Sequence, residues 1–227
     1  MTPTPALLVF DVNETLSDMS PMADRFVEVG APAAMATTWF ASLLRDGFAL
    51  TAAGDNPRFA DVGRAVLRPM LARELRHTEV EGAVEHVLGG FGRLALHPDV
   101  EAGVRRLHDA GVRMVTLSNG STAVAQGLLE RAGLLDCVER LLTVEDAPRW
   151  KPAPESYAYA LEVCRVAPAD AMLVAVHPWD LHGARAAGLR TAWVERGTAR
   201  YPGHMAAPEL TASGIDDLAR QLGAAEG

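Results

Sequence analysis

The residues best suited to chemistry stand directly after apolar, β-branched runs of the sequence. Asp11 follows the apolar run 6–10, and Thr15 lies four residues further on. If residues 6–10 form a buried strand, Asp11 lies at its carboxyl end, where open α/β sheets bind ligands. A carboxylate held there can act as a covalent nucleophile and form an ester that water later hydrolyses. The alternative is that Asp11 simply caps the turn that follows the strand.

Three further apolar runs end in the same way. The side chains that follow runs 112–117, 141–144 and 171–176 are, in turn, Ser118 and Asn119, then Lys151, then His177, Trp179 and Asp180. Each of them alone is consistent with an ordinary turn or a solvated loop residue. Parallel strands end at one edge of their sheet, so a carboxylate, a hydroxyl, a lysine and a second carboxylate there together predict a catalytic site.

The elements that must position these residues alternate regularly along the second half of the chain. Helices are expected at 99–110, 121–132, 154–164 and 181–187, and strands at 112–117, 141–144, 171–176 and 191–194. This order predicts an α/β fold with a parallel, doubly wound sheet and helices on both faces. The strand at 6–10 must belong to the same sheet, because alone it could not bury both of its faces.

Between the first strand and this alternating region, the sequence is mostly helical. Helices are expected at 20–30, 33–50, 59–75 and 80–91, with Pro69 marking a break or kink in the third. Four helices without an intervening strand predict a small bundle. We therefore divide the chain into an α/β core of residues 1–16 and 97–227 and a helical cap of residues 17–96. A cap inserted at this point would cover the strand ends as a lid.

Composition limits the partners and the location. The formal net charge of −8 disfavours nucleic acid and anionic membranes, although a local cationic pocket can still accept a small anionic substrate. No run approaches the roughly 20 apolar residues of a membrane span, and the N-terminus lacks the basic region of a signal peptide. Cys137 and Cys164 fit neither a disulfide framework nor a zinc pattern, so we expect a cytoplasmic protein. The apolar cap residues could form a homodimer face or close their own core.

The motifs, taken in order, resemble those of the haloacid dehalogenase (HAD) superfamily. The matching residues are Asp11-x-x-x-Thr15, Ser118-Asn119, Lys151-Pro152 and Asp180, and residues 17–96 match the inserted helical cap. The resemblance covers nearly the whole chain, and the order of the four motifs is specific, although any one of them is weak. It implies a Rossmann-like core and an aspartate nucleophile.

Within the superfamily, the sequence resembles the L-2-haloacid dehalogenase branch. Asn13 stands where the phosphatases usually carry a second aspartate that works as a general acid. The stretch 174–177 lacks the carboxylate with which phosphatases hold magnesium, and Tyr157 stands at the dehalogenase offset from Lys151. The resemblance therefore implies no metal and no cofactor.

Two positions depart from the dehalogenase pattern. Trp39 is followed by Phe40, where dehalogenases have an arginine that takes the departing halide, and the nearest arginine is Arg45. Ala175 and His177 stand where dehalogenases have a serine and an asparagine that position water. The pKa of an ordinary histidine, near 6.5, suits a base or a water-positioning group, but His177 could equally pack in a turn.

The resemblance implies that Asp11 displaces halide from a short 2-haloacid while Lys151 keeps Asp11 ionised. Asp180, with His177, would orient the water that hydrolyses the ester. Substrate contacts are expected from Thr15, Phe40, Arg45, Ser118, Asn119, Tyr157 and Trp179. One alternative is a magnesium-dependent phosphatase of a small phosphorylated metabolite, in which Asp11 forms an aspartyl-phosphate. Another is a binding protein that kept the fold without catalysis.

Overall fold

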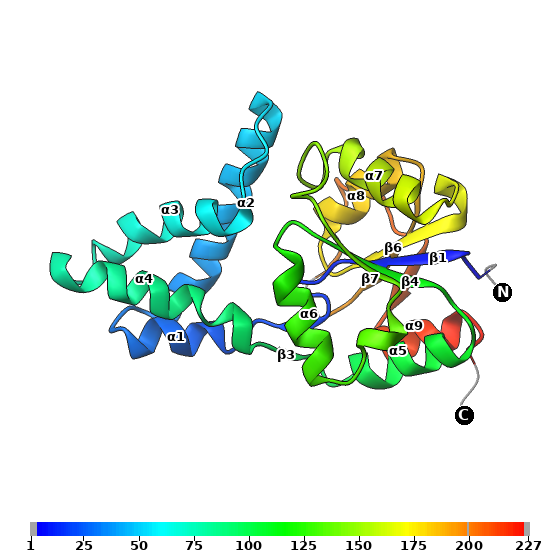
Figure 1. The fold of residues 1–227 in the computed structure, drawn as a ribbon, viewed down its shortest axis with the longest axis horizontal. Helices are drawn as coiled ribbons and strands as arrows, with labels where there is room; N and C mark the ends of the chain where they lie inside the picture. The colour runs from blue at the N-terminus through cyan, green and yellow to red at the C-terminus, as the bar shows by residue number, and fades with distance from the viewer. Residues whose placement is uncertain (1–3, 199, 225–227) are drawn as a thin grey trace.

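The centre of the fold is a six-stranded parallel sheet with helices on both faces (Figure 1). The computed structural model describes residues 4–198 and 200–224. The strands, in the spatial order β5-β4-β1-β6-β7-β8, are β5 (Arg140–Thr143), β4 (Met114–Ser118), β1 (Leu7–Phe10), β6 (Ala171–Ala175), β7 (Arg190–Val194) and β8 (Leu210–Ala212). The chain runs from β1 outward through β4 and β5, then returns to the other side of β1 at β6. This reversal beside β1 opens a crevice at the carboxyl ends of the strands, where ligands bind in such sheets.

The two faces of the sheet pack into two separate apolar cores. Leu7 and Val9 of β1 join one core, and Leu8 and Phe10 join the other. The first face is covered by α7 (Pro154–Cys164) and α8 (Pro178–Ala186), and the second by α5 (Val100–Asp109), α6 (Thr122–Arg131) and α9 (Ile215–Gln221). Because both faces are buried, the strands are continuous apolar runs in the sequence. The predicted doubly wound α/β sheet is confirmed.

A separate group of helices lies beside the sheet, at the left of Figure 1. It contains α1 (Met22–Glu28), α2 (Met35–Ala53), α3 (Phe59–Leu71) and α4 (Val80–Leu88). Two short 3₁₀ helices, η1 (His77–Glu79) and η2 (Phe91–Arg93), belong to the same stretch of the chain. Two others, η3 (Leu135–Cys137) and η4 (Pro168–Asp170), lie between elements of the α/β core. The strands β2 (Ser17–Asp18) and β3 (Ala95–Leu96) pair antiparallel where the chain enters and leaves this helical group. We therefore propose residues 17–96 as the helical cap.

The cap has an aromatic interior that continues onto the core. Trp39 is fully buried, packs against Phe26 and Phe91, and donates from Nε1 to the carbonyl of Gly63 at 2.9 Å. Phe59, also on the cap, stacks on Trp150 of the core with ring centroids 5.6 Å apart. This contact seats the cap against the loop that carries Lys151.

The structure differs from the sequence expectations at several element ends. Helix α3 continues through Pro69 and ends at Leu71, and α8 begins at Pro178, where proline suits the first helical turn. The elements β8 and α9 were not predicted, because a three-residue edge strand is too short to show a pattern and forms by pairing with β7. No helix of the described residues is both long and apolar enough to cross a bilayer.

Candidate active site

Asp11 follows β1, and its carboxylate is held by three donors from different parts of the chain. Lys151 Nζ lies 2.8 Å from Oδ1, while the Thr15 hydroxyl donates to Oδ2 at 2.7 Å and His177 Nδ1 lies 3.0 Å from Oδ2. Burial would raise the pKa of Asp11, but the Lys151 charge and the His177 hydrogen bond outweigh it and hold this pKa well below its usual range. Asp11 is therefore ionised.

Lys151 is itself fixed on every side. Its Nζ also donates to Asp180 Oδ2 at 2.7 Å, and both side chains are fully buried. The Asn119 side chain accepts the backbone N–H of Lys151 at 3.0 Å and donates to its carbonyl at 3.2 Å. Burial would lower the pKa of Lys151, but the charges of Asp11 and Asp180 raise it. The ammonium group therefore stays charged beside the nucleophile.

Asp180, Tyr157 and Asn119 are joined to Lys151 by hydrogen bonds, Tyr157 through Asp180. Tyr157 is fully buried and its hydroxyl donates to Asp180 Oδ1 at 2.6 Å, so both carboxylate oxygens of Asp180 already have a donor. Burial and then the Asp180 charge raise the pKa of Tyr157 well above its usual value, so the phenol keeps its proton. In this structure Asp180 contacts the Lys151 ammonium group, Tyr157 contacts Asp180, and Asn119 binds the Lys151 backbone. The roles expected for them with water and substrate stay predictions.

His177 joins Asp11 to an acidic residue that the sequence analysis did not single out. Its Nε2 lies 2.8 Å from Glu14 Oε2, while its Nδ1 faces Asp11. Burial would lower the pKa of His177, but the hydrogen bonds to Asp11 and Glu14 outweigh it and raise the pKa to about 9. Phe40 and Trp179 pack beside the imidazole, with ring centroids 6.4 and 5.0 Å from it. Both aromatic residues reach the site, as neighbours of His177.

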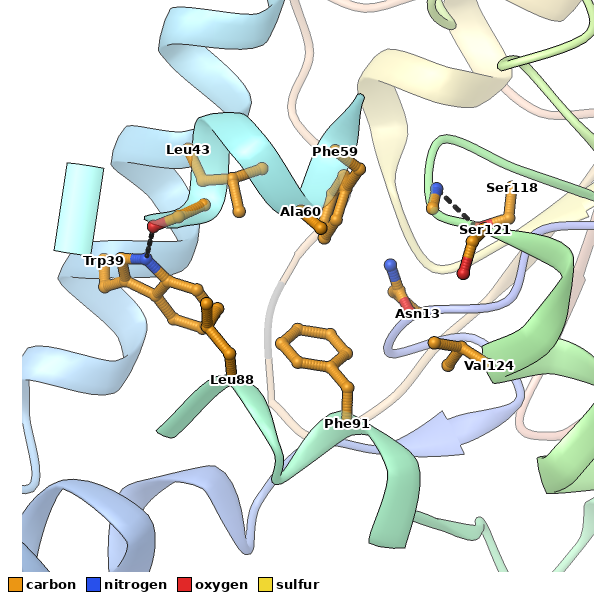
Figure 2. Close-up of a pocket in the computed structure, with 12 residues that line it drawn as sticks. Asn13, Trp39, Leu43, Phe59, Ala60, Leu88, Phe91, Ser118, Ser121 and Val124 are labelled. Carbon is orange, nitrogen blue, oxygen red and sulfur yellow. Dashed lines mark hydrogen bonds between the residues drawn. The ribbon is translucent and has the colours of Figure 1, made fainter. Parts of the chain in front are cut away.

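A small cavity lies between the cap and the carboxyl ends of the strands (Figure 2). Its volume is about 130 Å³, and it is lined by Asn13, Trp39, Leu43, Phe59, Ala60, Gly63, Leu88, Phe91, Ser118, Gly120, Ser121 and Val124. The cap side is apolar, whereas Asn13 and Ser118 bring polar groups from the core side. Ser118 Oγ accepts the N–H of Gly120 at 2.9 Å, which leaves its hydroxyl proton for a ligand. The cavity can hold a small organic acid.

A larger cleft of about 530 Å³, with both polar and apolar lining residues, borders His177. The cleft is lined by Glu14, Asp18, Met19, Ser20, Met22, Ala23, Ala36, Thr37, Phe40, His97, Val176, His177 and Arg196. Arg196 also braces the nucleophile turn, because its guanidinium donates to the Thr15 carbonyl at 2.8 and 3.1 Å and pairs with Asp99. The imidazole of His177 therefore stands between Asp11 and a space wide enough for water.

The structure does not bring Arg45 to this site. Its side chain is 71% exposed and pairs with Asp46 at 2.8 Å on the surface of α2, and it lines neither the cavity nor the cleft. Arg45 stands five positions after Phe40 in the chain. At 3.6 residues per turn, its side chain points about 140° away from that of Phe40 around the helix axis. Arg45 therefore cannot take the place of the halide-site arginine.

Glu14 is the functional candidate that sequence reasoning missed. It lies between Asp11 and Thr15, and its backbone φ of 60° is in the left-handed region that favours glycine. The signal in the sequence was an acidic residue within the nucleophile motif. Its meaning depended on His177, which lies 163 residues away in the chain.

The carboxylates of this site do not fit a magnesium ion. The Lys151 ammonium group already bridges Asp11 and Asp180, and the other oxygen of each carboxylate accepts from Thr15 or Tyr157. Within the described residues, no group of three or more His, Cys, Asp or Glu side chains is arranged to hold a metal.

A doubly wound sheet that carries an ionised aspartate beneath a helical insertion defines a class of hydrolases. Residues 5–188 match the family model of the haloacid dehalogenase-like hydrolases, so the chain belongs to that family.

Relatives of known name include haloacid dehalogenases and also phosphatases. Haloacetate dehalogenase H-2 of Moraxella sp. strain B is 31% identical over 51% of this chain and 52% of its own length. The (S)-2-haloacid dehalogenase of Xanthobacter autotrophicus is 29% identical over 83% of this chain and 74% of its own. A crystal structure of an L-2-haloacid dehalogenase matches with a TM-score of 0.86 at 25% identity, covering 97% of this chain and 99% of that one. The aligned part spans about half the length of the Moraxella relative.

Proposed function

We propose that this chain hydrolyses the carbon–halogen bond of short 2-haloacids through an ester on Asp11. The observation that carries the proposal is the state of the Asp11 carboxylate. It is buried, ionised and held by Lys151, Thr15 and His177, and Asn13, two residues further along the chain, lines the small cavity. A desolvated carboxylate with a fixed orientation is a better nucleophile toward carbon than one in water.

In the proposed first step, an oxygen of Asp11 attacks C2 of the substrate in line with the departing halide. The hydroxyl of Ser118 and the amide of Asn13 lie on the core side of the cavity, where they would bind the substrate carboxylate. Lys151 and Thr15 orient the nucleophile during the attack. Asp180, held by Tyr157, keeps Lys151 in place.

The size and lining of the cavity support a small substrate. A dry cavity of about 150 Å³ is known to accommodate benzene, so a volume of about 130 Å³ suits an acid with a short side chain. Trp39, Phe59 and Phe91 form the apolar side of the cavity. By excluding bulk water, they strengthen the polar contacts made to the substrate inside.

The test is a paired assay on the purified chain after treatment with a chelator. One arm supplies 2-chloroacetate, 2-bromoacetate and the two enantiomers of 2-chloropropionate, and measures halide release. Because the Xanthobacter relative is named an (S)-2-haloacid dehalogenase, we expect turnover of the (S) enantiomer. The other arm supplies a panel of phosphate esters with and without magnesium.

The Asp11→Asn variant serves as the background control in both arms. Metal-independent halide release that this variant lacks would support the proposal. Magnesium-dependent phosphate release without halide release would overturn it in favour of a phosphatase. Binding of 2-haloacids without turnover in either arm would overturn it in favour of a binding protein.

A further inference from the structure

Asp11, His177 and Glu14 form a chain of hydrogen bonds that leads from the proposed nucleophile to the cleft of about 530 Å³. His177 Nδ1 lies 3.0 Å from Asp11 Oδ2, and its Nε2 lies 2.8 Å from Glu14 Oε2. The His177 side chain is only 11% exposed, whereas that of Glu14 is 44% exposed and lines the cleft. An imidazole with a carboxylate on one nitrogen and the reacting centre on the other has the arrangement of a base and its orienting acid.

The backbone of Glu14 is held in an unfavourable conformation by its neighbours. Its φ of 60° is one that glycine adopts without cost and glutamate rarely does. His97 Nε2 lies 3.0 Å from the Glu14 carbonyl oxygen, and Arg196 binds the carbonyl of the next residue, Thr15. Strain of this kind persists where the surroundings determine the conformation, and it gathers at functional sites. Here it turns the Glu14 carboxylate onto His177.

The other acidic candidate for a base, Asp180, does not reach the space where water could enter. Its side chain has no exposed surface, lines neither the cavity nor the cleft, and is hydrogen-bonded to Lys151 and Tyr157. His177, in contrast, touches both the Asp11 carboxylate and the water-accessible cleft. Any water that attacks the Asp11 ester from the cleft meets His177 first.

We propose that Glu14 is a positioning residue that keeps a proton on His177 Nε2, so that Nδ1 accepts a proton from the water that hydrolyses the Asp11 ester. This inference rests on the proposed function. Glu14 acts through His177 and does not itself touch the reacting atoms. His177 and Glu14 would assist the hydrolysis of the ester, whereas Lys151 would orient Asp11 while the ester forms.

The proton and electron balance of the proposed sequence closes. When the ester forms, the halide leaves with the bonding electrons and Asp11 loses its negative charge. The imidazolium then releases its Nδ1 proton to water in the cleft. The proton on Nε2 stays there and is donated in a hydrogen bond to Glu14. Water attacks Cγ of Asp11 while one of its protons moves to Nδ1, which restores the imidazolium. The bond between Cγ and the ester oxygen that is attached to C2 of the substrate then breaks. The departing alkoxide takes the second water proton, and the carboxylate of Asp11 is restored.

The charges around His177 favour this cycle. The groups that face it or lie next to its partners are Asp11, Glu14, Lys151, Asp180 and, in the cleft, Asp18, His97 and Arg196. In the free enzyme, Asp11 and Glu14 together keep the imidazole protonated and raise its pKa to about 9. Esterification removes the charge of Asp11 only. The Nδ1 proton then loses its charged acceptor, while the Nε2 proton keeps the Glu14 carboxylate as its acceptor.

The first test separates ester formation from ester hydrolysis in the Glu14→Gln variant. Rapid quenching and mass spectrometry of the intact chain would follow the mass of the Asp11 ester, with halide measured in parallel. We expect a burst of one halide per chain, accumulation of the ester, and hydrolysis slower by about 10²-fold or more. Glu14→Gly is the second variant, because glycine suits the backbone at this position and keeps the fold.

The matched control is Asp24→Asn, which removes the charge of an exposed carboxylate on α1. Asp24 lines neither the cavity nor the cleft, so this variant should hydrolyse the ester at the wild-type rate. Equal rates of ester hydrolysis in the wild type, Glu14→Gln and Glu14→Gly would overturn the inference. A wild type that releases no halide would instead overturn the proposed function.

A second test does not depend on turnover. Asp11→Asn places a neutral amide where the ester would be, and ¹⁵N-histidine NMR reports the tautomer and the pKa of His177. We expect neutral His177 with the proton on Nε2 in Asp11→Asn, and loss of that preference when Glu14→Gln is added. The same tautomer and the same pKa with and without the Glu14 carboxylate would overturn the inference.

Discussion

Lys151 Nζ lies 2.8 Å from Asp11 Oδ1, although 140 residues separate the two in the chain. Both side chains are buried, so each depends on the other to remain charged away from water. The contact joins the end of β1 to the loop that precedes α7, and it ties the chemistry of the site to the stability of the fold.

Replacing Asp11 by asparagine should abolish turnover and leave the fold in place. An amide is not a nucleophile toward carbon, so halide release should fall by about 10³-fold or more. Circular dichroism would check that the secondary structure is unchanged. Asp109→Asn is the matched control, because the Asp109 side chain is 78% exposed and lies far from the site on α5. Full activity in Asp11→Asn would contradict the covalent mechanism.

Lys151→Met should be strongly destabilising as well as inactive. It leaves the carboxylates of Asp11 and Asp180 buried without their shared cation, at an expected cost of about 3–5 kcal/mol in the free energy of unfolding. Urea denaturation at pH 7 would measure this loss. The loss should shrink in acid, because protonation removes the two unpaired charges. A loss that is the same at pH 5 and pH 7 would contradict the electrostatic explanation.

The cavity should favour bromide and chloride over fluoride as leaving groups. Among the residues that line it, none carries a positive side chain to receive the halide. Fluoride holds its hydration most tightly, and its departure into an apolar space is the most costly. We expect bromoacetate and chloroacetate to react at least tenfold faster than fluoroacetate. A tenfold ratio corresponds to a difference of about 1.4 kcal/mol in activation free energy. Halide release at matched concentrations would measure the order.

Arg45→Ala should leave kcat/KM for every haloacid unchanged. The structure places this arginine on the cap surface beside Asp46, outside both the cavity and the cleft. Steady-state kinetics with chloroacetate would test this. A large rise in KM would show that the cap moves enough on binding to bring Arg45 to the substrate.

The imidazole of His177 should stabilise the fold at neutral pH and lose that effect in alkali. Its pKa in the folded chain, about 9, lies above the ordinary value of 6.5. The contribution is therefore complete below pH 6.5 and disappears as the pH rises through 9, with a total of about 3 kcal/mol. The measurement is the free energy of unfolding of the wild type and of His177→Gln at pH 6, 8 and 10. The difference between the two should narrow as the pH rises, and a constant difference would contradict the prediction.

Much of the architecture could be predicted from the sequence, because it depends on local patterns. The apolar runs predicted β1, β4, β5 and β6, and the glycines and prolines between them marked the helix ends. Strands that are buried on both faces have to be apolar throughout, so the parallel sheet and the order of its elements could be predicted from the apolar runs. The cap boundaries, a homodimer and a cytoplasmic location stay predictions.

The sequence also placed Asp11, Lys151, Ser118, His177 and Asp180 at strand ends or in the loops that follow them, since carboxyl ends of parallel strands meet at one edge. It could not assign their roles. Whether Asp180 faces water or Lys151 depends on packing that brings Tyr157 against it, and the helical phase of α2 decides that Phe40 and not Arg45 reaches the site.

The pairing of His177 with Glu14 was decided by tertiary structure alone. A hydrogen bond depends on distances of a few tenths of an ångström, which are set when two elements far apart in the chain pack together. The pKa of His177, the cavity that Ser118 lines and the cleft that His177 lines follow from the same packing. Residue types determine which chemistry is available, and three-dimensional neighbours determine which residue performs it.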